Sequence, residues 1–183
     1  MRIISGKARG TKINTIEGQE TRPTLDRVKE SVFNIIQNEI KESTFVDLFA
    51  GSGAIGLEAA SRGAKKAILC EKSKQAITVI KKNIEKTHLE DNIELYQLDY
   101  KELLESKLKE KIDIIYIDPP YKTDYIKKSI EIILKQNLVN KQSKIIIETD
   151  EEERILKEIQ EMPIQIIDKR KYGRAKIIIL RIF

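Results

Sequence analysis

The chain has 183 residues, and its 34 Lys and Arg against 29 Asp and Glu give a formal charge of +5. This length suits one domain with a substantial core, and 40% hydrophobic with 34% charged residues is typical of a folded globular protein. No apolar run approaches the ~20 residues of a membrane-spanning helix, and the first residues lack the apolar stretch of a signal peptide. We therefore expect a cytoplasmic protein that does not enter the membrane, and the basic balance permits a polyanionic partner.

The single cysteine and the single histidine exclude several kinds of site. An internal disulfide is impossible and a Cys- or His-rich zinc site cannot be built, so we expect no metal. His88 comes late in a helical stretch rich in lysine, which favours a solvated helix-end residue over a catalytic base. Cys70 falls on a predicted strand, where it is expected to be a buried, small apolar side chain.

Apolar runs rich in Ile, Leu and Val alternate with segments of helical spacing along the chain. The sequence predicts helices at 25–40, 54–62, 74–88, 99–109, 125–136 and 151–161, and strands at 44–50, 66–71, 93–98, 112–118, 143–148, 164–168 and 175–183. This alternation indicates a parallel, doubly wound sheet with helices on both faces. Only residues 169–174 join the last two strands, so the last strand is predicted to be antiparallel. The expected fold class is α/β with a seven-stranded, mostly parallel sheet.

Residues 1–43 do not fit the alternation. They begin with a short basic stretch and continue into the predicted helix 25–40, which has Pro23 near its start. The predicted buried stripe of that helix consists of Val28, Val32, Ile35, Ile36 and Ile40. We expect a core domain at 44–183 and, packed on it, an N-terminal basic extension with its helix at 1–43.

A glycine-rich turn follows the first predicted strand and opens a helix. Gly51, Gly53 and Gly56 satisfy the pattern G-x-G-x-x-G, which lets a ligand approach the backbone at a helix N-terminus. Such a turn also needs glycine for steric reasons alone. Glu71 lies 20 residues beyond Gly51 at the end of the second strand, where a carboxylate can bind ribose hydroxyls. Together these features favour a nucleoside-containing cofactor. NAD is disfavoured, because only one glycine fingerprint is present and a substrate domain does not fit.

The second motif, Asp118-Pro119-Pro120-Tyr121, directly follows the fourth predicted strand. Ligands of open α/β sheets bind at the carboxyl ends of the strands, so this motif should face the glycine turn. Two prolines stiffen the segment and remove two N–H groups. The Asp118 carboxylate and the Pro119 carbonyl are then acceptors beside the aromatic ring of Tyr121. This arrangement suits a planar group that carries an exocyclic amine.

These motifs resemble those of known enzymes. Residues 47–64 (DLFAGSGAIGLEAASRGA) and 118–121 (DPPY) look like class I S-adenosylmethionine-dependent amino-methyltransferases, which have a Rossmann-like fold. Residues 2–13 (RIISGKARGTKI) and 21–36 (TRPTLDRVKESVFNII) resemble more narrowly the RsmD family, bacterial methyltransferases that act on guanine N2 of 16S ribosomal RNA. The resemblance spans nearly the whole chain and implies a 16S rRNA substrate, within the small ribosomal subunit.

The resemblance also implies roles for individual residues. S-adenosyl-L-methionine would be bound by Arg22, Thr24, Asp47, Ala50, Gly51, Gly53, Glu71 and Asp99. Helix capping is an alternative role for Thr24 and for Asp99. Asp118 and Pro119 would hold the target amine, Tyr121 would stack on the base, and Pro120 completes this catalytic motif. Basic side chains at both ends of the chain are candidates for RNA phosphate contacts, namely Arg2, Lys7, Arg9, Lys12, Lys169, Lys171 and Arg174.

Other functions stay open at the level of the sequence. The D-P-P-Y motif also serves DNA adenine-N6 and cytosine-N4 methyltransferases, although no separate target-recognition domain fits into this length. A protein-glutamine methyltransferase and a non-catalytic RNA-binding assembly protein are further alternatives. We expect a monomer, because no apolar surface stripe is left over after the elements are packed.

Overall fold

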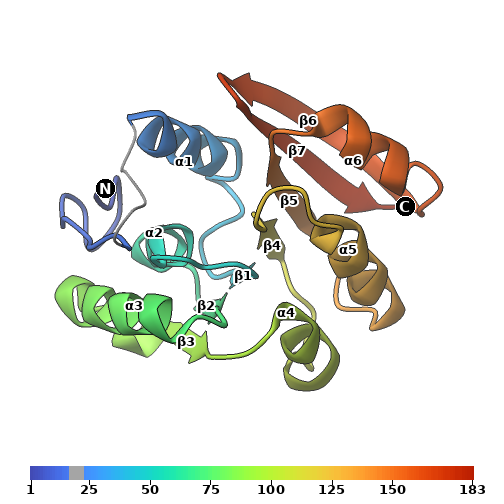
Figure 1. Cartoon of the computed structure of the whole chain (residues 1–183). Coiled ribbons are helices and arrows are strands. Elements are labelled where there is room, and N and C mark those ends of the chain that lie inside the picture. The colour runs from blue at the N-terminus through green and yellow to red at the C-terminus, as the bar shows by residue number, and fades with distance from the viewer. Residues whose placement is uncertain (17–22) are drawn as a thin grey trace.

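A computed structural model describes residues 1–16 and 23–183, with the side chains of the second range from residue 26 onward. Its centre is one seven-stranded sheet with the order β3-β2-β1-β4-β5-β7-β6 (Figure 1). The strands are β1 (Thr44–Asp47), β2 (Lys66–Cys70), β3 (Ile93–Tyr96), β4 (Ile114–Ile117), β5 (Lys144–Thr149), β6 (Ile164–Tyr172) and β7 (Ala175–Ile182). β1 to β5 are parallel, and β7 runs antiparallel to both of its neighbours, β5 and β6. The predicted mostly parallel sheet with an antiparallel last strand is confirmed.

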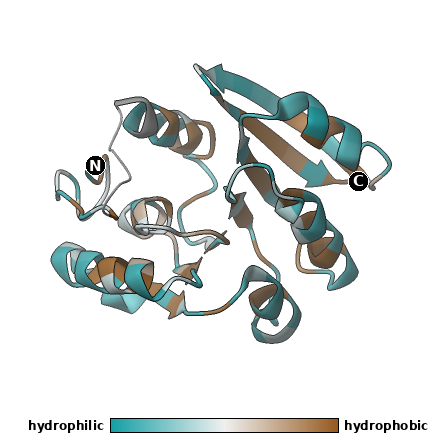
Figure 2. Ribbon diagram, in the orientation of Figure 1, coloured by the Kyte–Doolittle hydropathy of each residue, from teal (hydrophilic) through white to brown (hydrophobic). Residues whose placement is uncertain are grey.

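Helices cover both faces of the sheet, as predicted, and each face has its own core. α1 (Pro23–Ile35), α2 (Ala54–Ser61) and α3 (Lys74–Thr87) pack on one face. The other face is covered by α4 (Tyr100–Glu102), the π-helical turn η2 (Leu103–Lys107), α5 (Tyr125–Lys135) and α6 (Glu152–Ile159). A short 3-10 turn, η1 (Glu90–Asn92), precedes β3. Figure 2 shows apolar colours in the inner strands and hydrophilic colours along the edge strand β6, and the helices carry both kinds of residue, as burial of the inner sheet on both sides requires. No helix in these described ranges is long and apolar enough to cross a membrane.

Three elements differ in extent from the prediction. The helix predicted at 25–40 ends at Ile35, and the chain continues in turns to Glu42, which has a positive φ of 62°. The predicted loop 169–174 is mostly strand, because β6 continues to Tyr172 and only Gly173 and Arg174 form the turn. β6 is longer than predicted because these residues pair with the apolar strand β7. A charged edge strand lacks the alternation of apolar residues from which a strand is predicted. The helix predicted at 99–109 is only the short α4 followed by η2.

The N-terminal segment, residues 1–16, is fixed on α2 through backbone groups. Glu58 of α2 is fully buried and accepts hydrogen bonds from the N–H groups of Ile4, at 2.8 Å, and Ser5, at 3.0 Å. Its carboxylate also pairs with Lys29 Nζ at 3.2 Å and with Arg62 Nε at 2.7 Å. These contacts hold the main chain of the segment while the side chains of Arg2, Lys7, Arg9 and Lys12 remain exposed.

Gly6 shows how closely the N-terminal segment approaches α2. A Cβ atom at Gly6 would lie 1.8 Å from the carbonyl oxygen of Ser61, and the φ of Gly6 is +86°. The Ser61 carbonyl accepts a hydrogen bond from the N–H of Lys7 at 2.8 Å, and the Ser61 hydroxyl accepts one from Ala8 at 3.0 Å. Any larger residue at Gly6 would force the segment away from the helix.

Candidate active site

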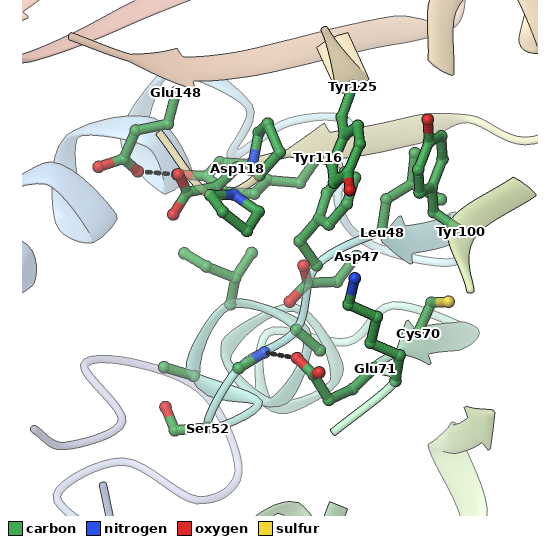
Figure 3. Close-up of a pocket in the computed structure, with 18 of the residues that line it drawn as sticks. Asp47, Leu48, Ser52, Cys70, Glu71, Tyr100, Tyr116, Asp118, Tyr125 and Glu148 are labelled. Atoms are coloured by element: carbon green, nitrogen blue, oxygen red, sulfur yellow. Dashed lines mark hydrogen bonds between the residues drawn. The ribbon is translucent and has the colours of Figure 1, made fainter. Parts of the chain in front are cut away.

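A cavity of about 1040 Å³ opens at the carboxyl ends of the parallel strands. Its wall includes residues that end or follow β1, β2, β3, β4 and β5, and Figure 3 shows their side chains converging on one space. This is the place where open α/β sheets bind ligands. The predicted site residues on this wall are Asp47, Ala50, Gly51, Glu71, Asp99, Asp118, Pro119, Pro120 and Tyr121.

The glycines of the turn after β1 have different roles. Gly51 lines the cavity with a φ of +54° and donates its N–H to Glu71 Oε2 at 3.0 Å. Gly53 is not part of the cavity wall. It packs against the sheet, and a Cβ there would lie 3.3 Å from the side chains of Leu69 and Ile80. Gly56 is tighter still, with Leu69 Cδ1 2.4 Å from its ideal Cβ. Gly53 and Gly56 therefore let α2 pack closely on the sheet.

Glu71 and Asp47 bring two carboxylates to the same wall as the glycine turn. The second oxygen of Glu71 accepts the N–H of Ser73 at 2.8 Å, so the backbone orients this side chain. Asp47 is 2% exposed and accepts the N–H of Gly56 at 3.2 Å. Burial raises the pKa of Asp47 to about 7, the charge of Glu71 adds to the effect, and hydrogen bonds from Gly56 and Phe49 oppose it.

The remaining residues predicted to bind the cofactor are placed less directly. The Asp99 carboxylate accepts the N–H of Lys101 at 3.0 Å and so caps α4, and Asp99 also lines the cavity. Arg22 lies outside the described residues. Thr24 belongs to the first turn of α1, and its side chain lies outside the described part of the chain.

Asp118, Pro119, Pro120 and Tyr121 form the wall of the cavity at the end of β4. Asp118 is exposed and lines the cavity. Partial loss of solvation at this wall raises the pKa of Asp118 well above its ordinary value, and the charges of Glu148 and Asp47 raise it further. The ring of Tyr121 is 73% exposed at the same wall, so it is accessible to a planar ligand.

The structure adds two site residues that the sequence reasoning missed. Glu148 is the last residue but one of β5, lines the cavity and accepts a hydrogen bond from the phenol of Tyr116 on β4. Burial raises the pKa of both groups, most strongly that of Tyr116. A charged residue directly after the apolar run Ile145–Ile147 is a sequence signal for such a position, but the signal becomes useful only when β5 is known to neighbour β4.

Three aromatic rings form another missed part of the wall. Phe49, Tyr100 and Tyr125 contact one another with ring centroids 5.1 to 6.0 Å apart. The hydroxyl of Tyr100 is buried and has no hydrogen-bond partner among the described residues. This cluster lies beside Asp99 and gives the cavity an apolar, polarizable end.

The basic residues predicted to bind RNA lie in two separate groups. Arg2 adjoins the cavity, because Met1 and Lys29, which donates to the Arg2 carbonyl, belong to its wall. Lys7 lies farther along the segment, beside Ser61 at the C-terminal end of α2. Lys169, Lys171 and Arg174 are exposed on the β6–β7 hairpin, where Lys169 pairs with Glu152 at 2.7 Å. Figure 1 shows α1 between the N-terminal segment and the hairpin, so the two groups do not form one cluster.

Among residues 1–16 and 23–183, no set of three or more His, Cys, Asp or Glu side chains is arranged to hold a metal ion. His88 ends α3 in a solvent-exposed position and Cys70 is buried, as predicted.

The chain is similar to proteins of known family over most of its length. The model of the family described as "Conserved hypothetical protein 95" matches residues 1–181. The ribosomal RNA small subunit methyltransferase D of Buchnera aphidicola (subspecies Acyrthosiphon pisum) is 35% identical over 154 residues, which cover 84% of this chain and 80% of that protein. The protein of the same name from Escherichia coli K12 is 32% identical over 152 residues, covering 83% of this chain and 76% of the relative.

A solved structure shows the same similarity in three dimensions. The Haemophilus influenzae protein HI0767, a candidate methylase, superimposes with a TM-score of 0.82 at 27% identity, and the match covers 100% of this chain and 98% of that one. The sequence motifs, the Rossmann-like fold and the family match over nearly the whole length agree. The chain belongs to the family of the ribosomal RNA small subunit methyltransferases D.

Proposed function

We propose that this protein transfers a methyl group from S-adenosyl-L-methionine to the exocyclic N2 amine of a guanine in 16S rRNA of the small ribosomal subunit. The observation that carries the proposal is one cavity that joins the glycine turn and Glu71 to the Asp118–Pro119 acceptors. The names of the relatives, rRNA small subunit methyltransferases, support the substrate.

The donor set of the cavity fits the proposed cofactor. Glu71 would accept hydrogen bonds from the ribose hydroxyls through the lone pairs that its backbone partners leave free. Asp99 would face the adenine, beside the aromatic cluster of Phe49, Tyr100 and Tyr125. Ala50, Gly51 and Asp47 would border the rest of the molecule. When bound, the cofactor supplies an electrophilic methyl group on a sulfonium.

The chemical step follows from the acceptors at the end of β4. The lone pair of a guanine amine is delocalised into the ring, so the amine is a poor nucleophile. The Asp118 carboxylate and the Pro119 carbonyl would accept hydrogen bonds from the two N–H groups of the amine. These bonds align the nitrogen with the methyl group, while Tyr121 stacks on the base. A nitrogen–carbon bond forms and the carbon–sulfur bond breaks, with its electron pair left on sulfur. The nitrogen then loses one proton, and the raised pKa of Asp118 makes its carboxylate a suitable acceptor.

The basic surface would hold the RNA by its phosphates. Arg2, Lys7, Arg9 and Lys12 are exposed on a segment whose backbone is fixed, so their charges are presented from a rigid support. A guanine that is stacked or paired must turn out into the cavity, which costs a few kcal/mol. We propose that the protein acts as a monomer.

The test is methyl transfer from radiolabelled S-adenosylmethionine to three acceptors: unmodified small ribosomal subunits, naked 16S RNA and duplex DNA. Nucleoside analysis of the product should give N2-methylguanosine from the subunits. Label in DNA, or N6-methyladenine in RNA, would contradict the proposed base and substrate. Label in protein would identify a protein methyltransferase, and cofactor binding with no transfer to any acceptor would indicate a non-catalytic protein.

A further inference from the structure

Glu148 lies beside Asp118 at the end of the neighbouring strand. In the β4–β5 pairing, Tyr116 is opposite Ile146 and Ile117 is opposite Ile147, so the next residues along the two strands are Asp118 and Glu148. Neighbouring strands are about 4.8 Å apart, and paired residues of parallel strands point to the same face. Both side chains line the cavity, and Figure 3 shows them on the same side of it.

Tyr116 fixes the orientation of the Glu148 carboxylate. Its phenol is buried and donates a hydrogen bond to Glu148 Oε2. Burial and the surrounding carboxylates raise the pKa of Tyr116, so the phenol stays a donor. One carboxylate oxygen is therefore committed to the tyrosine, and the other is left as an acceptor at the cavity wall. Lys29, the buried cation of that wall, is already paired with Glu58 at 3.2 Å and bonded to the Arg2 carbonyl at 2.5 Å.

Guanine and 2-aminopurine, which also lacks the O6 carbonyl, differ at the ring nitrogen next to the reacting amine. In guanine the edge that carries N2 continues with N1–H, which is a donor. In 2-aminopurine the same amine is followed by an unprotonated N1, which is an acceptor. A fixed carboxylate oxygen one strand away from the amine acceptors attracts the N1–H of guanine and repels the unprotonated N1 of 2-aminopurine.

We propose that Glu148, held by Tyr116, is a specificity-determining residue that accepts a hydrogen bond from N1–H of the target guanine. This inference rests on the proposed guanine-N2 transfer. Asp118 and Pro119 would hold the amine that reacts, and Glu148 would select the base that carries it. The two carboxylates at the ends of β4 and β5 thereby have separate tasks, one at the reacting nitrogen and one at the neighbouring ring nitrogen.

The test compares two acceptors that differ only at the methylated position, once that position has been mapped. One carries guanine and the other 2-aminopurine, in small subunits reconstituted with a ligated RNA. Wild-type protein should methylate guanine roughly 10- to 100-fold faster in kcat/KM, as expected for loss of a hydrogen bond to a charged acceptor. Equal rates on the two acceptors would overturn the proposal without any variant.

The variant Glu148→Gln gives a second, independent readout. Its amide oxygen can accept the hydrogen bond of Tyr116, which turns the NH₂ group toward the cavity as a donor. The preference for guanine should then fall to about threefold or less, with slower transfer to guanine and faster transfer to 2-aminopurine. Glu148→Ala should lose guanine activity without gaining 2-aminopurine activity. Unchanged cofactor affinity by calorimetry serves as the folding control.

The outcomes separate this inference from the proposed function. If wild-type protein makes N2-methylguanosine and Glu148→Gln keeps the full guanine preference, Glu148 does not select the base and only this inference fails. If wild-type protein forms no N2-methylguanosine on any acceptor, the proposed function fails first, and the role of Glu148 falls with it.

Discussion

Glu58 allows the strength of the N-terminal attachment to be calculated and tested. Its carboxylate is fully buried and receives four donors: the N–H groups of Ile4 and Ser5, the ammonium of Lys29 and the guanidinium of Arg62. In Glu58→Gln the amide supplies one acceptor oxygen and adds two N–H donors. At least two of the former partners then lose their acceptor, and the ammonium of Lys29, only 2% exposed, loses its counter-charge.

Breaking a buried ion pair by neutralising one partner costs about 3–5 kcal/mol, a large part of the 5–15 kcal/mol stability of a typical domain. We expect Glu58→Gln to lower the free energy of unfolding by that amount in urea titrations. The matched control is Glu94→Gln, because Glu94 also pairs with a lysine, at 3.1 Å, but is 41% exposed. This control should change stability by less than about 1 kcal/mol. A loss below about 1 kcal/mol for Glu58→Gln would refute the reasoning, since it would mean that water reaches the carboxylate.

Three further predictions concern the site and the RNA surface. Asp118→Ala should abolish methyl transfer and leave cofactor affinity nearly unchanged, measured by activity and calorimetry, and a variant with normal turnover would remove Asp118 from the reaction. Arg9→Glu should weaken RNA binding and reduce the slope of log affinity against log salt by about 1; the control Lys135→Glu, with the same charge change on α5, should leave the slope as it is. The pKa of Asp47, about 7 when folded, lies above its unfolded value of about 3.9, so the folded chain holds a proton that the unfolded chain releases. This linkage lowers stability as pH rises from about 4 to 7, and Asp47→Asn should flatten that part of the urea-derived stability profile; an unchanged profile would assign the dependence to other groups.

Patterns within one stretch of sequence predicted the strand and helix order and most of the cavity wall. The glycine turn and the Asp118–Tyr121 motif each carry local signals, and both line the cavity apart from the tightly packed Gly53 and Gly56. Glu148 was missed because its importance depends on β5 pairing with β4, which no local pattern states. The end of β6 was missed for the same reason, since Lys169 to Lys171 become strand only by pairing with β7.

The positions of the two chain ends have a practical consequence for protein production. Residue 1 belongs to the cavity wall, so a purification tag fused ahead of it would begin beside the cavity. The last strand is antiparallel, and it therefore finishes at the edge of the sheet opposite the cavity, where Phe183 is 67% exposed. A tag placed after Phe183 leaves the entrance clear, whereas an uncleaved N-terminal tag is expected to depress measured activity with no change in the fold.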